Sequence, residues 1–285
     1  MLDHFSQALT LDQIDALMFR SVTAAGRTGQ TRSSMVRVQA LVAAGRTVSK
    51  EHALASTQSA WQDEEHPAYA VTYKVDAQDT AGEVVRRRVT AVQRGRTLMT
   101  LHASFDRPQD GRSSAHRCSD DARSGPAGQV PPVLGDRSSH WEVVPMLTRL
   151  PVEVRTARDA DWLEPIPARS GSDRLRVWLR AVVTLHDDLL HACMLSRVCD
   201  ELAGSVALHR HGVASDDARV AWRNLDQTMW LLERVRFDDW LLIDLQSPWA
   251  GSSRALCRAR VRDRSGRFIA EVTQEVLVHL TGRDD

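Results

Sequence analysis

The chain has 285 residues, of which 42% are hydrophobic and 26% charged, a composition typical of a folded globular protein. Lys plus Arg and Asp plus Glu both total 37, and this zero net charge argues against a nucleic-acid-binding protein, which would carry a basic excess. No run of about 18 apolar residues predicts a membrane span. The four cysteines are scattered (Cys118, Cys193, Cys199 and Cys257), and residues 1–6 lack a signal-peptide pattern. We therefore expect a cytoplasmic protein with reduced thiols.

In the first half of the chain, the hydrophobic pattern predicts two helices followed by antiparallel strands. The expected helices cover residues 9–20 and 36–48, and the expected strands cover 53–62, 68–77, 83–93 and 96–105. Ile14, Leu17 and Met18 share one face of the first expected helix. Gly95 separates the last two strands and predicts a hairpin between them.

Residues 107–139 differ in composition, being rich in Ser, Gly, Pro and Asp and poor in large apolar side chains. A structureless loop of this length is unusual inside one compact domain, so the segment predicts a linker between two units. We accordingly expect an N-terminal domain at 1–106, a flexible linker at 107–140 and a C-terminal domain at 141–285.

The second half repeats the order of the first. Asp187 and Asp188 predict the cap of a helix at 189–202, and strands are expected at 152–155, 175–181, 225–235, 240–246, 254–263 and 267–278. Gly266 marks a second hairpin, 171 residues after Gly95. Besides the short helix at 9–20, each half thus has one helix and a long-stranded antiparallel sheet. The predicted fold is α+β, a double hotdog in which two long sheets each wrap a central helix and pair edge to edge.

Four stretches of the second half resemble the acyl-CoA thioesterase II family. They are Asn224–Trp230 (NLDQTMW), Asp239–Leu242 (DWLL), Ser247–Arg254 (SPWAGSSR) and Thr273–Glu275 (TQE). The resemblance implies a double hotdog that hydrolyses acyl-CoA thioesters. It also implies that three polar residues hold and activate a water. Asp200 and Gln274 match the family's Asp and Gln, and Asn224 stands where the family has Thr or Ser.

The chemistry of these three residue types fits hydrolysis. A desolvated Asp has a raised pKa and suits the removal of a proton from water. A Gln amide accepts one hydrogen bond and donates another, so Gln274 can orient that water. Asn224 can position a water through its amide, but it lacks a hydroxyl that donates and accepts at one atom. Taken singly, Asp200 and Gln274 are typical of exposed residues, and Asn224 is typical of a turn.

The sequence also departs from the family in regions that shape the acyl or CoA pocket. Arg32–Met35 replaces an aromatic-Gly-Gly-Gln segment, Gln227 replaces a His, and Leu231–Arg234 replaces Phe-His-Arg-Pro. The expected substrate is therefore left as an acyl-CoA or an acyl-carrier-protein thioester. No nucleotide-binding glycine motif and no G-x-S-x-G elbow occurs, and His209 and His211 lack a third ligand nearby, so we expect no cofactor and no metal.

Two other functions stay open on the same scaffold. One is a hotdog enzyme of another reaction type, such as a dehydratase or a biosynthetic-pathway enzyme, and the other is a non-catalytic acyl-thioester-binding protein. Cys193 and Cys199 are expected to be buried structural thiols rather than nucleophiles. We also expect a homodimer or a dimer of dimers, because sheet edges and the apolar residues at 240–243 and Trp249 would need cover.

Overall fold

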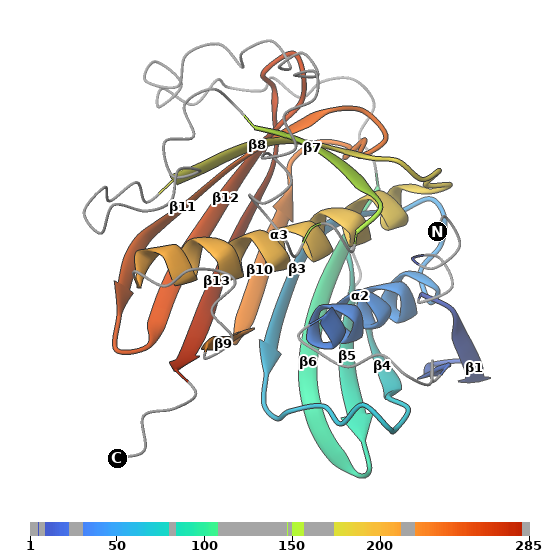
Figure 1. Cartoon of the computed structure of the whole chain (residues 1–285). Helices are drawn as coiled ribbons and strands as arrows, with labels where there is room; N and C mark the ends of the chain where they lie inside the picture. The colour runs from blue at the N-terminus through green and yellow to red at the C-terminus, as the bar shows by residue number, and fades with distance from the viewer. Residues whose placement is uncertain are drawn as a thin grey trace.

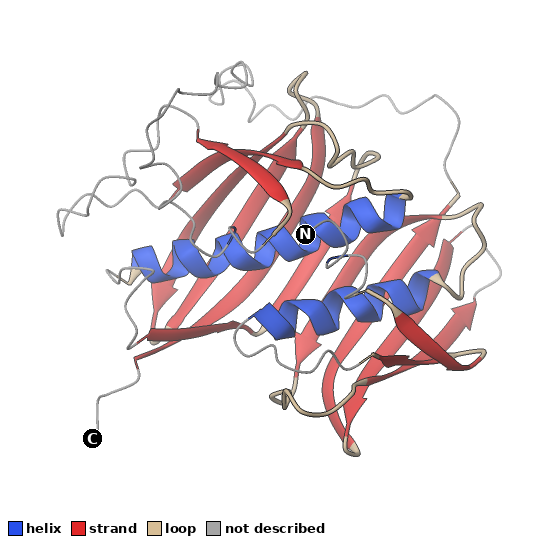
Figure 2. Cartoon of the chain, turned by 45° about the vertical axis from the view of Figure 1, so that its right-hand side comes forward, coloured by secondary structure: helices blue, strands red, loops and turns tan. Residues whose placement is uncertain are grey.

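The computed structural model describes residues 9–22, 31–79, 84–107, 150–156, 174–211 and 220–280, together with Phe5 and Leu147. These residues form one 13-stranded antiparallel sheet with two helices on the same face (Figures 1 and 2). The helices are α2 (Thr31–Gly45) and α3 (Asp188–Arg210). The strands are β1 (Leu11–Asp15), β2 (Met18–Ser21), β3 (Ala53–Trp61), β4 (Thr72–Asp79), β5 (Val84–Gln93), β6 (Arg96–Asp106), β7 (Val152–Thr156), β8 (Arg174–Ala181), β9 (Val220–Asn224), β10 (Asp226–Leu231), β11 (Leu241–Gly251), β12 (Arg254–Arg262) and β13 (Phe268–Leu280).

The order of the strands repeats about the middle of the sheet. The first half runs β1-β2-β4-β5-β6-β3, and the second runs β10-β13-β12-β11-β8-β7, so β3 and β10 are the equivalent inner edges of two half-sheets. They pair antiparallel, with Thr228 opposite Gln58 and Trp230 opposite Ser56. The double hotdog is therefore confirmed, and its two sheets are joined into one. The predicted linker lies outside the described residues apart from Arg107, so the domain boundaries stay predictions.

Both predicted hairpins are present. Gly95 joins β5 to β6 with a φ of 81°, and Gly266 lies between β12 and β13 with a φ of 85°. Positive φ is the backbone region that glycine adopts without a steric penalty. In the first hairpin the preceding residue, Arg94, is also left-handed, with a φ of 51°.

The predicted helix at 9–20 is wrong, because this segment forms the hairpin β1–β2. Two of the residues expected to face the core are exposed, Ile14 at 54% and Leu17 at 41%, whereas Leu11 and Phe19 are buried. Strand β2 hydrogen-bonds to β4 and so extends the sheet. Pairing with a neighbouring strand outweighed a weak helical periodicity in a short segment.

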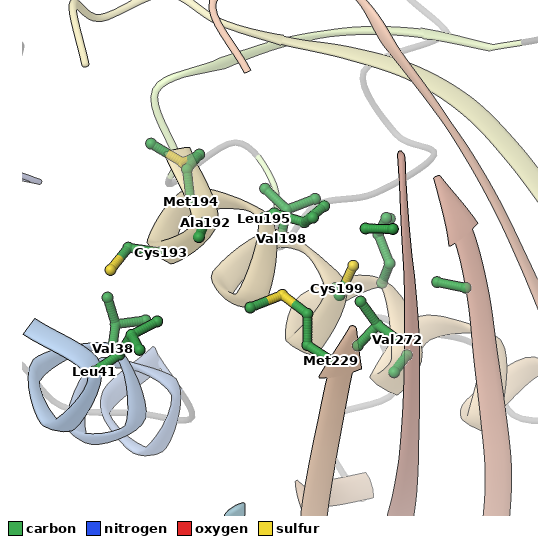
Figure 3. Close-up of a cluster of buried hydrophobic side chains, with 14 of the residues drawn as sticks. Val38, Leu41, Ala192, Cys193, Met194, Leu195, Val198, Cys199, Met229 and Val272 are labelled. Carbon is green, nitrogen blue, oxygen red and sulfur yellow. The ribbon is translucent and has the colours of Figure 1, made fainter. Parts of the chain in front are cut away.

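Helix α3 is buried along most of its length, and it begins as predicted. Asp187 caps it, since its Oδ1 accepts a hydrogen bond of 2.8 Å from the backbone N of Leu190. In Figure 3, Cys193 of α3 points toward Val38 and Leu41 of α2, and Met229 of β10 and Val272 of β13 come from the facing sheet. The two helices and the sheet thus share one core. Neither helix of the described part is long and apolar enough to cross a membrane.

Candidate active site

The structure brings Asn224 and Gln274 against the turn of α3 that carries Asp200. Asn224 ends β9, and its Nδ2 donates to the backbone O of Asp200 at 3.3 Å. Gln274 lies on β13, and its Nε2 donates to the backbone O of Cys199 at 2.7 Å. The side chains are 1%, 7% and 1% exposed for Asp200, Asn224 and Gln274 respectively. The exposed position expected for Asp200 and Gln274 when each is taken singly is therefore wrong, because both side chains are buried where α3 packs on the sheet.

Gln227 of β10 connects the carboxylate to Gln274. Its Nε2 lies 2.7 Å from Oδ1 of Asp200 and 3.0 Å from Oε1 of Gln274. Its Oε1 accepts a hydrogen bond of 2.6 Å from Oγ of Ser196, one turn before Asp200 on α3. The amide that replaces the family's His is therefore the centre of the network. Sequence comparison marked this position as a departure, but it did not predict the role.

Arg37 of α2 supplies a cation to the same site. Its Nη1 forms an ion pair with Oδ2 of Asp200, and both side chains are buried. Its Nε donates to Oγ of Ser59 on β3 at 2.8 Å, and this hydroxyl in turn donates to the backbone O of Gln227 at 3.3 Å. Sequence reasoning missed Arg37. The available signal was a charged residue near the start of a helix predicted to be buried, in the stretch 36–44 (VRVQALVAA), where Gln39 is the other polar residue.

The site thus lies where the two halves of the chain meet. Arg37 and Ser59 come from the first half, and the other members come from the second. The register of the central ladder places Ser59 opposite Gln227. Packing of α2 against α3 brings Arg37 within reach of Asp200. Neither half contains the whole site.

Burial dominates the electrostatics of Asp200. Desolvation raises the pKa of this carboxyl above its usual value, while the charges of Arg37 and Arg197 and hydrogen bonds from Arg37 and Gln227 oppose the rise. Arg197 is itself paired with Glu201 on the same helix, at 3.1 Å, and both are 3% exposed. Two buried ion pairs therefore adjoin each other, and their formal charges cancel.

Two buried polar atoms beside Asp200 have no hydrogen-bond partner among the described residues. They are Nη2 of Arg37, a donor, and Oδ1 of Asn224, an acceptor. Both belong to side chains that hold Asp200 through another atom. Buried polar groups nearly always have a hydrogen-bond partner in folded proteins. One donor and one acceptor beside Asp200 that no described residue satisfies therefore indicate that a small polar group can bind there.

A glycine lets β9 approach α3 at this point. A Cβ built on Gly204 would lie 2.3 Å from the indole ring of Trp222, a separation that real Cβ atoms do not show. Trp222 and Asn224 are alternate residues of β9 and are both buried, so they share the face toward α3. Because Gly204 has no side chain, Trp222 can pack against α3 at this point. Asn224, two residues along β9, then reaches Asp200, one helical turn before Gly204.

The thiols near the site are not nucleophiles. Burial raises the pKa of Cys193 and Cys199 far above the usual range and that of Cys257 to about 12, so all three are protonated at neutral pH. The three are free and buried, as predicted for Cys193 and Cys199. Within the described ranges, no three His, Cys, Asp or Glu side chains gather as a metal site.

Comparison with known proteins identifies the family. The sequence model described as "Acyl-CoA thioesterase C-terminal domain" matches residues 125–278, more than half of the chain. The chain belongs to the acyl-CoA thioesterase II family. This thioesterase is 27% identical over 253 residues to acyl-coenzyme A thioesterase 8 of Mus musculus, covering 85% of this chain and 78% of the relative. With the Homo sapiens protein of the same name it is 25% identical over 267 residues, with the same two coverages.

Solved structures agree with this assignment. The acyl-CoA thioesterase II TesB2 from Mycobacterium marinum superposes with a TM-score of 0.75 at 27% identity, covering 96% of this chain and 98% of that one. A hot dog protein from Alicyclobacillus acidocaldarius has a TM-score of 0.68 at 16% identity, covering 97% and 98%, and it supports the fold alone. The thioesterase is thus a thioester hydrolase with the double hotdog fold.

Proposed function

We propose that this thioesterase hydrolyses its substrate with a water that Asp200, Gln274 and Asn224 hold and activate. The observation that carries the proposal is the buried carboxylate of Asp200, fixed by a network that includes both of the other side chains. A carboxyl with a pKa raised by burial is a stronger base once ionised, and so it suits proton transfer from water near neutral pH.

The proposed reaction begins when Asp200 takes a proton from the water. The water oxygen bonds to the thioester carbonyl carbon, and the carbon–sulfur bond then breaks. The thiolate leaves with the proton that Asp200 had accepted, so the carboxylate is regenerated. Oδ1 of Asn224 accepts a hydrogen bond from the attacking water. Gln274 has amide capacity beyond its bonds to Cys199 and Gln227, and it orients the same water.

The substrate class that we propose is acyl-CoA. The matching family and the relatives are named for it. An acyl-carrier-protein thioester contains the same reacting bond. An assay with both kinds of substrate therefore has to distinguish acyl-CoA from acyl-carrier protein. We place the reaction in the cytoplasm, where the free thiols of the chain would stay reduced.

The test is release of free thiol from a panel of acyl-CoA and acyl-carrier-protein substrates. Asp200→Asn should lower kcat at least about a hundredfold, as expected when a general base is removed. Glu201→Gln is the matched control, because it neutralises a neighbouring carboxylate that is equally buried and also paired with an arginine. If Asp200→Asn keeps most of the activity, Asp200 is not the base.

The same assay separates the alternative reactions. Chromatography of the products should yield the free acid and the free thiol. A product that is dehydrated but still a thioester would indicate another hotdog reaction, and binding without turnover would indicate a non-catalytic protein.

We also propose that the thioesterase forms a homodimer or a dimer of dimers. The expectation that the apolar residues 240–243 need a partner to cover them is wrong, because all four are buried within the chain. Trp230 and Trp249 remain 44% and 51% exposed, and Leu256, opposite Trp249 on the next strand, is 39% exposed. Large exposed apolar side chains such as the adjacent Trp249 and Leu256 favour association. Light scattering that gives 31.8 kDa would show a monomer instead.

A further inference from the structure

Arg37 is a buried cation with one guanidinium nitrogen that no described residue accepts a hydrogen bond from. Its side chain is 2% exposed. Nε is bound to Ser59 and Nη1 to Asp200, whereas Nη2 has no hydrogen-bond partner among the described residues. Arginine does not lose its proton in proteins, so the charge is permanent. A buried ion pair is weak evidence of a role in stability, since well-packed apolar residues often replace one without loss.

The other charged groups near Asp200 have hydrogen-bond or ion-pair partners of their own. Arg197, the other guanidinium that acts on Asp200, is paired with Glu201. Asp226, whose carboxyl also senses the charge of Arg37, accepts a hydrogen bond of 2.7 Å from the backbone N of Glu275. The groups that face Asp200 from β10 and β13 are the neutral amides of Gln227 and Gln274.

We propose that Arg37 is a catalytic residue of the thioesterase, with Nη2 donating a hydrogen bond to the carbonyl oxygen of the bound thioester. The proposal rests on the function proposed above, because it requires Asp200 to act as the base. It adds a residue from the first half of the chain, from the helix that departs from the family's pattern at its N-terminal end.

The movement of charge during the reaction explains why one arginine would serve both groups. Before the reaction, the negative charge lies on Asp200 and is paired with Arg37. As the water adds to the carbonyl carbon, its proton goes to Asp200 and the electron pair of the carbonyl π bond goes to oxygen. The negative charge has then moved from the carboxylate to the oxyanion. The planar guanidinium presents donors to both acceptors at once, so its charge stays paired without a change in its position.

The return step balances in the same way. The oxyanion re-forms the carbonyl bond, the carbon–sulfur bond breaks, and the thiolate takes the proton from Asp200. The negative charge returns to the carboxylate beside Nη1. Asn224 complements this arrangement, because its Oδ1, to which no described residue donates, is an acceptor for the water while Nη2 of Arg37 is a donor for the carbonyl.

The test uses Arg37→Lys and Arg37→Gln in the full chain, with acyl-CoA thiol release as the readout. Both variants should lower kcat about a hundredfold or more, the effect of losing one oxyanion donor, while KM changes little. Arg37→Lys keeps a positive charge beside Asp200, so the buried carboxylate stays paired. Circular dichroism would show whether either variant misfolds. Arg87→Gln is the matched control, because Arg87 is also buried in the first half but is bonded to Thr47, away from the site.

Chemical rescue separates a catalytic role from a structural one. Guanidinium ion at millimolar concentration should restore part of the kcat of Arg37→Ala and none of that of Asp200→Asn. A kcat of Arg37→Lys and Arg37→Gln within a few-fold of the wild type would overturn the proposal for Arg37 even if Asp200→Asn is inactive. Activity that persists in Asp200→Asn would instead overturn the proposed function, so the two failures are distinguishable.

Discussion

Ser59 of β3 lies opposite Gln227 of β10, and each of these residues holds one member of the same buried ion pair. Ser59 accepts a hydrogen bond from Arg37, and Gln227 donates one to Asp200. The two strands are the inner edges of the half-sheets, and they pair with each other to make the sheet continuous. The joint between the halves and the candidate active site are therefore built from the same residues.

Gln227→Leu should destabilise the thioesterase and nearly abolish its activity. The change leaves Oδ1 of Asp200, Oε1 of Gln274 and Oγ of Ser196 without their bonds to the amide. Unsatisfied buried groups cost about 1–3 kcal/mol each, so with three of them the free energy of unfolding in urea should fall by about 3 kcal/mol or more. Gln58→Leu, on the neighbouring strand and exposed to solvent, should change it little. Equal effects of the two changes would contradict a network centred on Gln227.

Gly204→Ala should lower both stability and kcat. The added methyl group meets the ring of Trp222, and overpacking of this kind costs about 1–3 kcal/mol. Displacement of Trp222 along β9 would also move Asn224 away from Asp200. In a double-mutant cycle with Trp222→Leu, the methyl group should cost much less, because the ring it meets is gone. Additive effects would show that the two residues do not interact.

The pH dependence of kcat/KM should have an acidic limb above the usual range of an aspartate. Burial raises the pKa of Asp200, and hydrolysis requires the ionised form, so activity rises as pH increases through that pKa. Arg37→Gln removes an adjacent positive charge, and its acidic limb should move to still higher pH. A limb at the ordinary aspartate value in both proteins would mean that another group titrates.

The same pKa shift fixes the sign of the effect of pH on stability. The folded state binds the proton of Asp200 more tightly than the unfolded state does. The contribution of this group is therefore fully present below the unfolded pKa and is lost as pH rises through the folded pKa. The free energy of unfolding of the wild type, relative to Asp200→Asn, should fall over this interval. Urea unfolding at several pH values would measure it.

Ser253→Gly should stabilise the turn between β11 and β12. Ser253 has a φ of 62° and Ser252 a φ of 48°, so both occupy the left-handed region. Glycine adopts this region without strain, and the gain should be about 0.5–1 kcal/mol with unchanged kcat. Ser265→Gly, in the β12–β13 hairpin but outside the left-handed region, is the control and should give no gain. A thermal unfolding series would measure both changes.

Local patterns in the sequence were enough to predict most elements. Alternation predicted the long strands, and Gly95 and Gly266 predicted the hairpins, because these features depend on neighbouring residues alone. The segment at 9–20 failed because its state depends on pairing with β4, which lies far along the chain. Strand β9 was not predicted, since five residues beside a longer strand give little periodicity.

The sequence by itself determined the double hotdog fold, the family, and the positions of Asp200 and Gln274, because each depends on local pattern or on motif spacing. Only the tertiary structure decided what surrounds the carboxylate. Arg37 lies 163 residues from Asp200, and Gln227 takes its role through contacts with α3 and β13 at once. The contact of Arg37 with Asp200 depends on how β3 pairs with β10 and how α2 packs on α3, whereas those of Gln227 depend on how β10 pairs with β13 and faces α3. No periodicity within either half encodes a hydrogen bond that forms only when the two halves meet.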